Sequence, residues 1–260
     1  MELQGQVAIV TGAGRGIGHA TALELARMGA DVVVAELDRA NAERTASELR
    51  DLGCRARAVP TDVTSRKDLE AMAGQARAEF GRIDVLVNNA GIYRAAETLD
   101  VTEEHWDAVM NINAKAVFFA SQTVLPTMIA QKRGVIVSLA SMAGKIGSRA
   151  NLPYNASKAA VISMTKSLAI AHAADGIRVN CVCPGSVRDD ARLDSAMLKG
   201  VAEEFGVPLD RHEQEFASYH LFPVLMEARD ISRAYVWLAS DDCVRVTGAI
   251  FSLDAGFIAK

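Results

Sequence analysis

The sequence has few cysteines, no basic block and no long apolar run, and each shortage excludes a class of protein. Its 260 residues include four cysteines, whose spacing fits neither a dense disulfide framework nor a zinc site. No apolar stretch approaches the ~20 residues that a membrane-spanning helix needs. The N-terminus lacks the basic and apolar regions of a secretion signal. We therefore expect a cytoplasmic protein that does not span a membrane.

Charge is not concentrated anywhere in the chain. The formal net charge is -4 and the pI is about 5.8. No basic patch is interleaved with aromatic residues, which argues against nucleic acid as a partner. Half of the residues are apolar, enough for a substantial core. The length suits one domain, since single α/β domains often have roughly 200–250 residues.

Two of the cysteines, Cys181 and Cys183, occupy alternate positions of a predicted strand and so share one face. One interpretation is a pair of metal ligands. We favour the other, in which they are small buried side chains in a reducing cytosol. The five histidines show no HxxxH or HxH spacing, so we predict no metal site.

Short apolar runs rich in β-branched residues alternate with amphipathic stretches. The predicted strands are Gln6–Val10, Asp31–Ala35, Arg55–Val59, Ile83–Val87, Gly134–Ser138, Ile177–Val182 and Ala249–Leu253. The predicted helices are Ile17–Met28, Arg39–Leu52, Ser65–Phe80, Glu103–Gln131 and Tyr154–Ala173. This alternation is typical of a parallel sheet covered on both faces, so we predict a doubly wound, Rossmann-like α/β fold. The segment 186–229 is charged and helical without a strand, and we predict that it forms a flap over the site.

A glycine-rich segment, Thr11–Gly18, follows the first predicted strand and opens the first predicted helix. Glycines let the backbone approach a pyrophosphate, and the helix N-terminus offers unpaired N–H groups. The spacing is Gly-x3-Gly-x-Gly, and many glycine-rich turns are only tight connections. The place of this one between strand and helix indicates a nucleotide site. Its candidate residues are Gly12, Gly14, Arg15, Gly16, Ile17 and Gly18.

Glu36 ends the second predicted strand. A carboxylate there can accept hydrogen bonds from the adenosine ribose hydroxyls and would repel a 2′-phosphate, which predicts NAD rather than NADP. Arg15 argues the other way, since its cation would attract a 2′-phosphate. We expect Glu36 to dominate, because its carboxylate would first have to be neutralised.

Two further segments follow predicted strands at the same edge of the sheet. The Asp62 carboxylate would accept a hydrogen bond from the adenine amino group, or it would begin a turn or cap the next helix. Its position alone does not decide between these roles. The sequence Asn88-Asn89-Ala90-Gly91 has small residues that leave room for a cofactor. The candidate cofactor-binding residues here are Asp62, Val63, Asn89, Ala90 and Gly91.

The most informative set of residues is Asn113, Ser141, Tyr154 and Lys158. Tyr154 and Lys158 are four residues apart, so they share a helix face. Lys158 and the nicotinamide charge would lower the tyrosine pKa from its ordinary value of about 10 toward the range useful near pH 7. Ser141 would hydrogen-bond the substrate oxygen. Asn113 would hold a water that passes protons from Lys158, which would also bind the nicotinamide ribose.

The order of these motifs resembles the short-chain dehydrogenase/reductase family, in its single-domain branch of about 250 residues. The motifs are TGAGRGIG, TDVT, NNAG, Trp106 before Asn113, Ser141, YNASK from Tyr154, Pro184-Gly185 and Thr247-Gly248. The resemblance implies a seven-stranded parallel sheet in the order 3-2-1-4-5-6-7 and hydride transfer at a carbinol or carbonyl carbon. It also implies a homotetramer or homodimer, with the fourth and fifth predicted helices forming one interface and the C-terminal strand region another.

The resemblance places further cofactor contacts after the sixth strand, at Pro184, Gly185, Val187 and Asp189. The family usually has a threonine that holds the nicotinamide carboxamide where this chain has Asp189. Carboxamide anchoring would therefore be different or weaker, unless Asp189 accepts from the amide. A second departure is Asp254-Ala255-Gly256, where many relatives have a Gly-Gly pair, and we expect only local backbone consequences.

Substrate contacts are implied, by the same resemblance, in segments 92–97, 142–152 and 186–222. The candidates are Tyr93, Arg94, Met142, Arg149, Asn151, Arg188 and Arg192. Several are cationic, which fits either an anionic substrate group or solvated arginines at the rim, and we favour the rim. The flap residues Phe205, Phe216, Tyr219, Leu221 and Phe222 are expected to pack as a lid.

We predict an NAD-dependent oxidoreductase that interconverts a small secondary alcohol, diol, polyol or hydroxy acid and its ketone. The alternative is an NADPH-dependent 3-oxoacyl reductase of the acyl-carrier-protein type, or another ketoreductase, which Glu36 opposes. A non-catalytic nucleotide sensor is a third interpretation. It is disfavoured because Tyr154 and Lys158 are both present.

Overall fold

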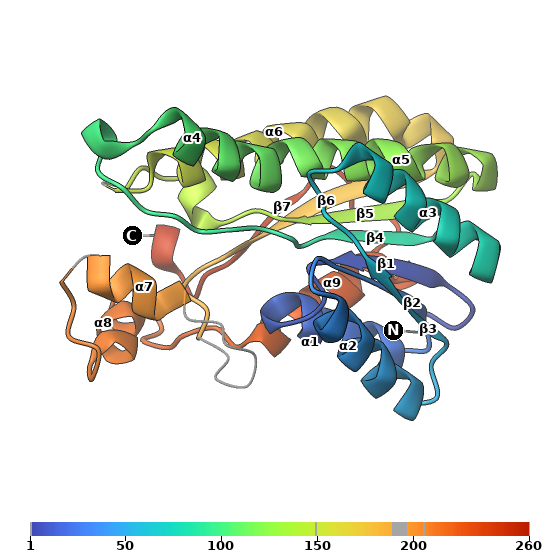
Figure 1. Ribbon diagram of the computed structural model, residues 1–260, viewed down its shortest axis with the longest axis horizontal. Helices are drawn as coiled ribbons and strands as arrows, with labels where there is room; N and C mark the ends of the chain where they lie inside the picture. The colour runs from blue at the N-terminus through green and yellow to red at the C-terminus, as the bar shows by residue number, and fades with distance from the viewer. Residues whose placement is uncertain (1, 149, 189–196, 205, 260) are drawn as a thin grey trace.

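A seven-stranded sheet organises the computed structural model, which describes residues 2–148, 150–188, 197–204 and 206–259 (Figure 1). Neighbouring strands pair in parallel in the order β3-β2-β1-β4-β5-β6-β7. The strands are β1 (Val7–Thr11), β2 (Asp31–Glu36), β3 (Ala56–Pro60), β4 (Val85–Asn88), β5 (Gly134–Leu139), β6 (Ile177–Pro184) and β7 (Ile250–Leu253). The predicted fold and strand order are confirmed, and the predicted strand boundaries differ by at most two residues.

Helices cover both faces of the sheet (Figure 1). One layer holds α1 (Gly16–Arg27), α2 (Arg39–Asp51) and α9 (Ala228–Ala239). The other layer holds α3 (Arg66–Phe80), α4 (Glu103–Met110), α5 (Ala116–Gln131) and α6 (Leu152–His172). The short helices α7 (Met197–Glu204) and α8 (His212–Ser218) lie apart from both layers (Figure 1).

Alternate residues of β1 enter two separate apolar cores, because successive strand side chains point to opposite faces. Ala8 and Val10 pack into the core that contains Leu25 of α1 and Tyr235 of α9. Ile9 packs into the other core, with residues of α3 and α5. The sheet is thus buried on both sides, which holds the carboxyl ends of its strands as a fixed platform for the loops that follow.

The described residues of the segment 186–229 contain no strand, as predicted, although Val187 pairs with Met226 in an isolated parallel bridge. The segment differs from its prediction at its end. The end of the segment already belongs to α9, a helix that was not predicted and that covers the sheet. Within the described residues, α7 and α8 are the part of the segment that is helical as predicted.

Candidate active site

The four predicted catalytic side chains lie together after β4 and β5. Ser141, two residues after β5, hydrogen-bonds the Tyr154 hydroxyl. Lys158 Nζ lies 5.5 Å from the Tyr154 ring centroid. A Cβ added to Gly91 would lie 3.2 Å from Asn113 Oδ1 and 3.7 Å from Lys158 Nζ, so these two side chains meet beside the turn after β4. The structure brings the tetrad into one site, and the chemical role of each member remains a prediction.

Asn113 lies in a π-helical turn, Asn111–Lys115, which interrupts the single helix predicted over Glu103–Gln131. Such turns occur frequently at functional sites. The buried Asn113 amide accepts from Ile92 N at 2.8 Å and donates to Ile92 O at 2.9 Å. It also donates to Ser157 Oγ at 3.2 Å. Asn113 therefore fastens the segment after β4 to α6, a role distinct from the predicted holding of a water.

The pKa of Tyr154 corrects one expectation. Burial raises this pKa to about 12, and the hydrogen bond from Ser141 opposes the increase only in part. Lys158 does not offset the burial, because its Nζ donates to Leu139 O at 2.8 Å. With these protein groups alone, Tyr154 is neutral at pH 7, which is the form that donates a proton.

Lys158 is also shifted by burial. Its side chain is 3% exposed, and this desolvation lowers its pKa from 10.5 to about 8, against an opposing effect of Cys183 and Cys181. A pKa near 8 leaves the ammonium charged at pH 7 yet able to exchange its proton near the working pH. This property suits the predicted proton relay.

We expect Lys158→Met to remove a pH dependence of stability. In the unfolded chain Lys158 keeps its proton up to pH 10.5, whereas in the folded protein it loses the proton near pH 8. Between these values the unfolded state binds more protons, so raising the pH stabilises the wild type, by up to about 3 kcal/mol. Urea denaturation near both ends of this range should show the wild type gaining stability relative to Lys158→Met.

The control for this experiment is Lys166→Met, because Lys166 lies exposed on the same helix. This variant should follow the wild type across the pH range. If Lys158→Met gained as much stability as the wild type, the pH dependence would not come from Lys158.

The loop between β1 and α1, together with the first turn of α1, has no room for side chains at three glycines. A Cβ at Gly12 would lie 2.9 Å from Ala90 Cα, and one at Gly14 would lie 2.8 Å from Glu36 Cγ. A Cβ at Gly18 would lie 2.1 Å from Gly12 O. These close approaches fix the loop against the turn after β4 and the end of β2.

The outer side of the same loop is open. Gly16 has a φ of +55°, and a Cβ there would meet nothing within 4 Å. Arg15, the exposed N-cap of α1, makes no side-chain cap hydrogen bond. The first N–H groups of α1, beginning near Ile17, therefore have no capping side chain and can bind an anion such as a pyrophosphate.

Glu36 lies on the glycine loop. Its Oε2 accepts from Gly14 N at 3.0 Å and its Oε1 accepts from Asp38 N at 3.2 Å. Arg44 Nη2 donates to Gly14 O at 3.0 Å, so both sides of the Gly14 residue are held by side chains. Arg44 was not predicted as a site residue, because an arginine in the second turn of an amphipathic helix carries no motif.

Asn89 joins the turn after β4 to the glycine loop. Its N–H donates to Thr11 Oγ1 at 3.0 Å, and its Nδ2 donates to Thr11 O and Gly12 O at 3.1 Å each. Among the residues that the structure describes, its buried Oδ1 has no hydrogen-bond partner. A buried acceptor without a donor is unfavourable, and a ligand N–H or O–H would satisfy it. This unpaired oxygen and the open side of the glycine loop therefore fit the binding of a dinucleotide.

Asp62 makes turn contacts. Its Oδ1 accepts from Thr64 N at 2.9 Å and from Thr64 Oγ1 at 2.7 Å. The N-cap of α3 is Ser65. Asp62 therefore begins a turn and does not cap this helix. Val63 packs against the core beneath β3 and α3. A contact between Asp62 and adenine remains a prediction.

The chain after β6 is fastened to α8 by His220. Gly185 has no room for a side chain, since its Cβ would lie 2.7 Å from His220 Nε2. His220 Nε2 accepts from Ser186 N at 3.2 Å, while Nδ1 donates to Phe216 O at 2.9 Å. His220 thus supports the turn from Pro184 to Val187, although nothing in the sequence marked it. Asp189 and its neighbour Asp190 lie outside the described residues.

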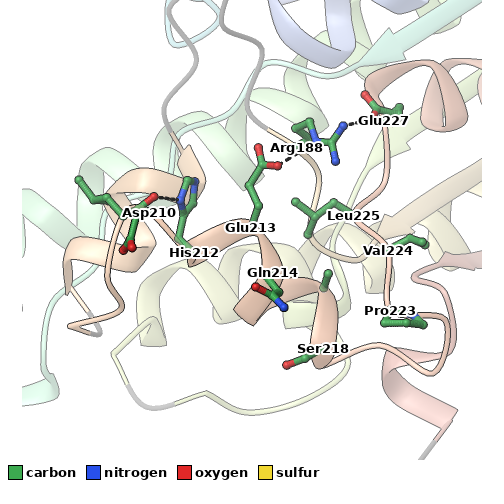
Figure 2. A pocket seen from close by; sticks show the side chains of 12 residues that line it. Arg188, Asp210, His212, Glu213, Gln214, Ser218, Pro223, Val224, Leu225 and Glu227 are labelled. Carbon is green, nitrogen blue, oxygen red and sulfur yellow. Dashed lines mark hydrogen bonds and ion pairs between the residues drawn. The ribbon is translucent and has the colours of Figure 1, made fainter.

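An open hollow of ≈ 840 Å³ lies between α8 and residues 223–227 of the predicted flap (Figure 2). Arg188 lies at its edge and pairs with Glu213 at 3.2 Å and with Glu227 at 2.9 Å. Because two carboxylates already neutralise this guanidinium, it is poorly suited to bind an anionic substrate, which agrees with the rim interpretation. Arg149 and Arg192 lie outside the described residues.

The flap aromatic residues do not pack as one lid. Phe216 packs with Leu198, Ala202 and Leu225 as expected. Phe222 is 72% exposed and was wrongly predicted to pack, because its backbone N–H bonds Ala255 O and directs the chain along the C-terminal turn. Leu221 and Tyr219 are also exposed, and Phe205 lies outside the described residues.

The family of this chain follows from its match to a known protein family. The family model described as short chain dehydrogenase matches residues 6–196. The chain belongs to the short-chain dehydrogenase family. It is accordingly an oxidoreductase that acts on CH–OH groups or their carbonyl products with NAD(P).

Relatives of this short-chain dehydrogenase cover its whole length. It is 36% identical over 265 residues to a 3-oxoacyl-[acyl-carrier-protein] reductase of Thermotoga maritima, covering 99% of this chain and 100% of the relative. It is 35% identical to the (2S)-[(R)-hydroxy(phenyl)methyl]succinyl-CoA dehydrogenase subunit BbsD of Thauera aromatica, over 98% of each chain. A solved structure titled as a short-chain alcohol dehydrogenase from Sinorhizobium meliloti has a TM-score of 0.91 at 32% identity, covering 100% and 98% of the two chains. The names differ in substrate, so the likeness fixes the reaction type alone.

A membrane-spanning helix and a metal site were both predicted to be absent. In the described ranges, this short-chain dehydrogenase has no helix both long and apolar enough to cross a membrane. Its described residues also include no group of three or more His, Cys, Asp or Glu side chains that could hold a metal ion. Cys181 and Cys183 are buried free thiols that hydrogen-bond each other beneath α6.

Proposed function

We propose that this short-chain dehydrogenase is an NAD-dependent enzyme that interconverts a small secondary alcohol, diol, polyol or hydroxy acid and its ketone. The observation that carries the proposal is the convergence of Ser141, Tyr154 and Lys158 beside Gly91, next to the glycine loop. A phenol, a hydroxyl and an ammonium at a nucleotide site are the groups that proton transfer needs while the cofactor handles the hydride.

In the oxidation that we propose, NAD⁺ held at the glycine loop would supply the acceptor for the hydride of the carbinol carbon. Tyr154 takes the hydroxyl proton, and the remaining electron pair on oxygen completes the carbonyl group. Ser141 hydrogen-bonds the substrate oxygen and stabilises its developing charge. The positive charge of the bound nicotinamide would favour the phenolate form of Tyr154 that takes this proton, and Lys158 would hold the nicotinamide ribose. Asn113 keeps the turn after β4 in place and holds the water that connects Lys158 to solvent.

We infer NAD rather than NADP from Glu36. Its carboxylate lies at the end of β2 and contacts the backbone of the glycine loop. The cofactor contacts that we propose for the pyrophosphate and adenosine are made by Gly12, Gly14, Arg15, Gly16, Ile17, Gly18, Glu36, Asp62 and Val63. Those proposed for the nicotinamide side are made by Asn89, Ala90, Gly91, Tyr154, Lys158, Pro184, Gly185, Val187 and Asp189.

Replacing Glu36 by Ala is expected to lower the ratio of kcat/KM for NAD⁺ to that for NADP⁺ by about tenfold or more, because it removes a ribose acceptor and a charge that repels the 2′-phosphate. Steady-state kinetics with each cofactor measure the ratio. Glu43→Ala is the control, since Glu43 lies on the exposed face of α2 and pairs with Arg50. An unchanged ratio in Glu36→Ala would refute the role assigned to Glu36.

A second candidate, an NADPH-dependent 3-oxoacyl reductase, is favoured by one relative's name and by Arg44 beside the glycine loop. A guanidinium there would pair with a 2′-phosphate if Glu36 turned away. Faster turnover of an acetoacetyl thioester with NADPH than of any alcohol with NAD⁺ would replace our proposal by this one.

The reaction type is tested with an isotope. The protein is incubated with NAD⁺ and butane-2,3-diol deuterated at both carbinol carbons, and the reduced cofactor is analysed by mass spectrometry. We expect one deuterium in each NADH formed, because the hydride moves directly from carbon to the cofactor. Reduced cofactor without deuterium would contradict direct hydride transfer.

We extend the proposal to the whole molecule as follows. Residues 1–260 act as one domain with a substrate flap around 186–229, working in the cytoplasm as a homotetramer or homodimer. Exposed apolar side chains support an interface over α5 and α6, since Phe118 is 38% exposed and Ile170 is 82% exposed. Burial of such side chains by a second copy would be favourable.

A further inference from the structure

Tyr93 and Asn151 form a polar pair beside Tyr154. The Tyr93 hydroxyl donates to Asn151 Oδ1 at 2.5 Å. The ring of Tyr93 meets that of Tyr154 edge to face, with centroids 5.2 Å apart and an interplanar angle of 70°. Both members of the pair are half-buried. Tyr93 therefore lies next to the ring of the tyrosine that we propose as the proton acceptor.

Asn151 departs from the usual behaviour of its position. It is the N-cap residue of α6, where an asparagine side chain normally accepts from a backbone N–H of the first turn and contributes about 1 kcal/mol. Here it makes no side-chain cap hydrogen bond, and its oxygen bonds Tyr93 instead. Among the described residues, nothing accepts a hydrogen bond from its amide nitrogen. Asn151 thus lacks the usual N-cap hydrogen bond and makes a contact at the site instead. Departures of this kind from local preference are typical of functional positions.

The pair is held in place on both sides. Asn113 bonds both the N–H and the carbonyl of Ile92, the residue before Tyr93. Ala96 N donates to Ala150 O at 2.9 Å, so the segment after β4 runs beside the start of α6. A preorganised pair loses little freedom when it binds a ligand, which is what substrate selection requires.

We propose that Tyr93 and Asn151 bind a second, uncharged oxygen on a carbon adjacent to the reacting carbinol, so that the preferred substrates are vicinal diols, polyols and hydroxyketones. This inference rests on the proposed function. The Asn151 amide nitrogen supplies donors to that oxygen, and the Tyr93 hydroxyl orients the amide by donating to its Oδ1. Both groups are neutral, which suits an uncharged oxygen rather than a carboxylate.

The test compares substrates that differ by one hydroxyl group. Initial rates are measured with NAD⁺ for butane-2,3-diol against butan-2-ol, and for cyclohexane-1,2-diol against cyclohexanol. The wild type is expected to favour each diol by about tenfold or more in kcat/KM, the value of one or two added hydrogen bonds. Tyr93→Phe keeps the ring contact with Tyr154 and should remove most of this preference. Asn151→Ala should do the same, and in both variants kcat/KM should fall more for the diols than for the simple alcohols.

Tyr219→Phe is the matched control, because the Tyr219 hydroxyl bonds Glu215 in the exposed flap. It should keep the full diol preference. Equal loss of activity toward diols and simple alcohols in Tyr93→Phe and Asn151→Ala would mean that the pair only positions Tyr154, and would overturn the inference.

Different experimental results would contradict the inferred diol preference and the proposed function. A wild type that oxidises simple alcohols and diols equally well would retain the proposed function and overturn the specificity. A wild type that oxidises none of the four compounds with either cofactor would contradict the proposed function, and the inference with it. Thermal melting of each variant provides a second readout. Because Asn151 does not cap α6, Asn151→Ala should melt close to the wild type.

Discussion

Tyr154→Phe is expected to lower kcat/KM for alcohol oxidation by about 100- to 10,000-fold, the range that a general acid–base group supplies. The phenylalanine ring keeps the contact with Tyr93 but removes the hydroxyl that Ser141 bonds. Cofactor binding should change little, because the contacts that we propose for the pyrophosphate and adenosine, at the glycine loop and Glu36, do not involve this hydroxyl. The loss is measured by steady-state kinetics, and the Kd for NADH by fluorescence titration.

Tyr235→Phe is the matched control for this experiment. The Tyr235 hydroxyl is fully buried, and no described residue bonds it. Removing an unpaired buried hydroxyl is neutral or stabilising, so this variant should retain activity and melt at the same or a higher temperature. Near-normal turnover in Tyr154→Phe would show that another group accepts the proton.

Gly18→Ala is expected to have the second large effect, on both folding and cofactor binding. The added Cβ would lie 2.1 Å from Gly12 O and 2.5 Å from Asn89 Nδ2, and neither atom lies at the end of a flexible side chain that can move away freely. Overpacking of this kind costs about 1–3 kcal/mol or more. The glycine loop must move, so the Kd for NADH should rise by about tenfold or more.

The control is Gly74→Ala within α3, where an added Cβ meets nothing within 4 Å. Alanine favours a helix over glycine by about 0.5–1 kcal/mol, so this variant should be slightly more stable than the wild type and bind NADH normally. Thermal melting and NADH titration measure both proteins. Normal NADH binding by Gly18→Ala would contradict the close approach on which the loop geometry depends.

The fold was predictable because its signal is local. Each strand of the sheet is a short apolar run, and residues such as Ala8, Ile9 and Val10 are all buried because both faces are covered. Helix α9 was not predicted because the segment beside it is charged. Its apolar face could be recognised as a core face only from its packing on α1. The π-helical turn around Asn113 was also missed, since no local pattern separates it from the helices on either side.

The motif spacing predicted that Ser141, Tyr154 and Lys158 act at one site. The structure places these side chains near one another, and their roles remain a prediction. The electrostatics of the site were less predictable. The pKa of Tyr154 was predicted to fall, yet burial raises it to about 12, because desolvation depends on packing that sequence spacing does not specify. His220 was missed for a related reason, since its contact with Ser186 joins residues that no motif relates.

The most direct test of the account is an initial-rate assay with NAD⁺ and NADP⁺ at equal concentration. Purified protein is given secondary alcohols, vicinal diols, sugar alcohols and hydroxy acids in turn, and the absorbance near 340 nm is followed. We predict that NADH forms with at least one of these classes and that NADPH forms much more slowly with the same compound. Faster formation of NADPH, or no reaction of any class despite measurable NADH binding, would contradict an NAD-dependent alcohol dehydrogenase.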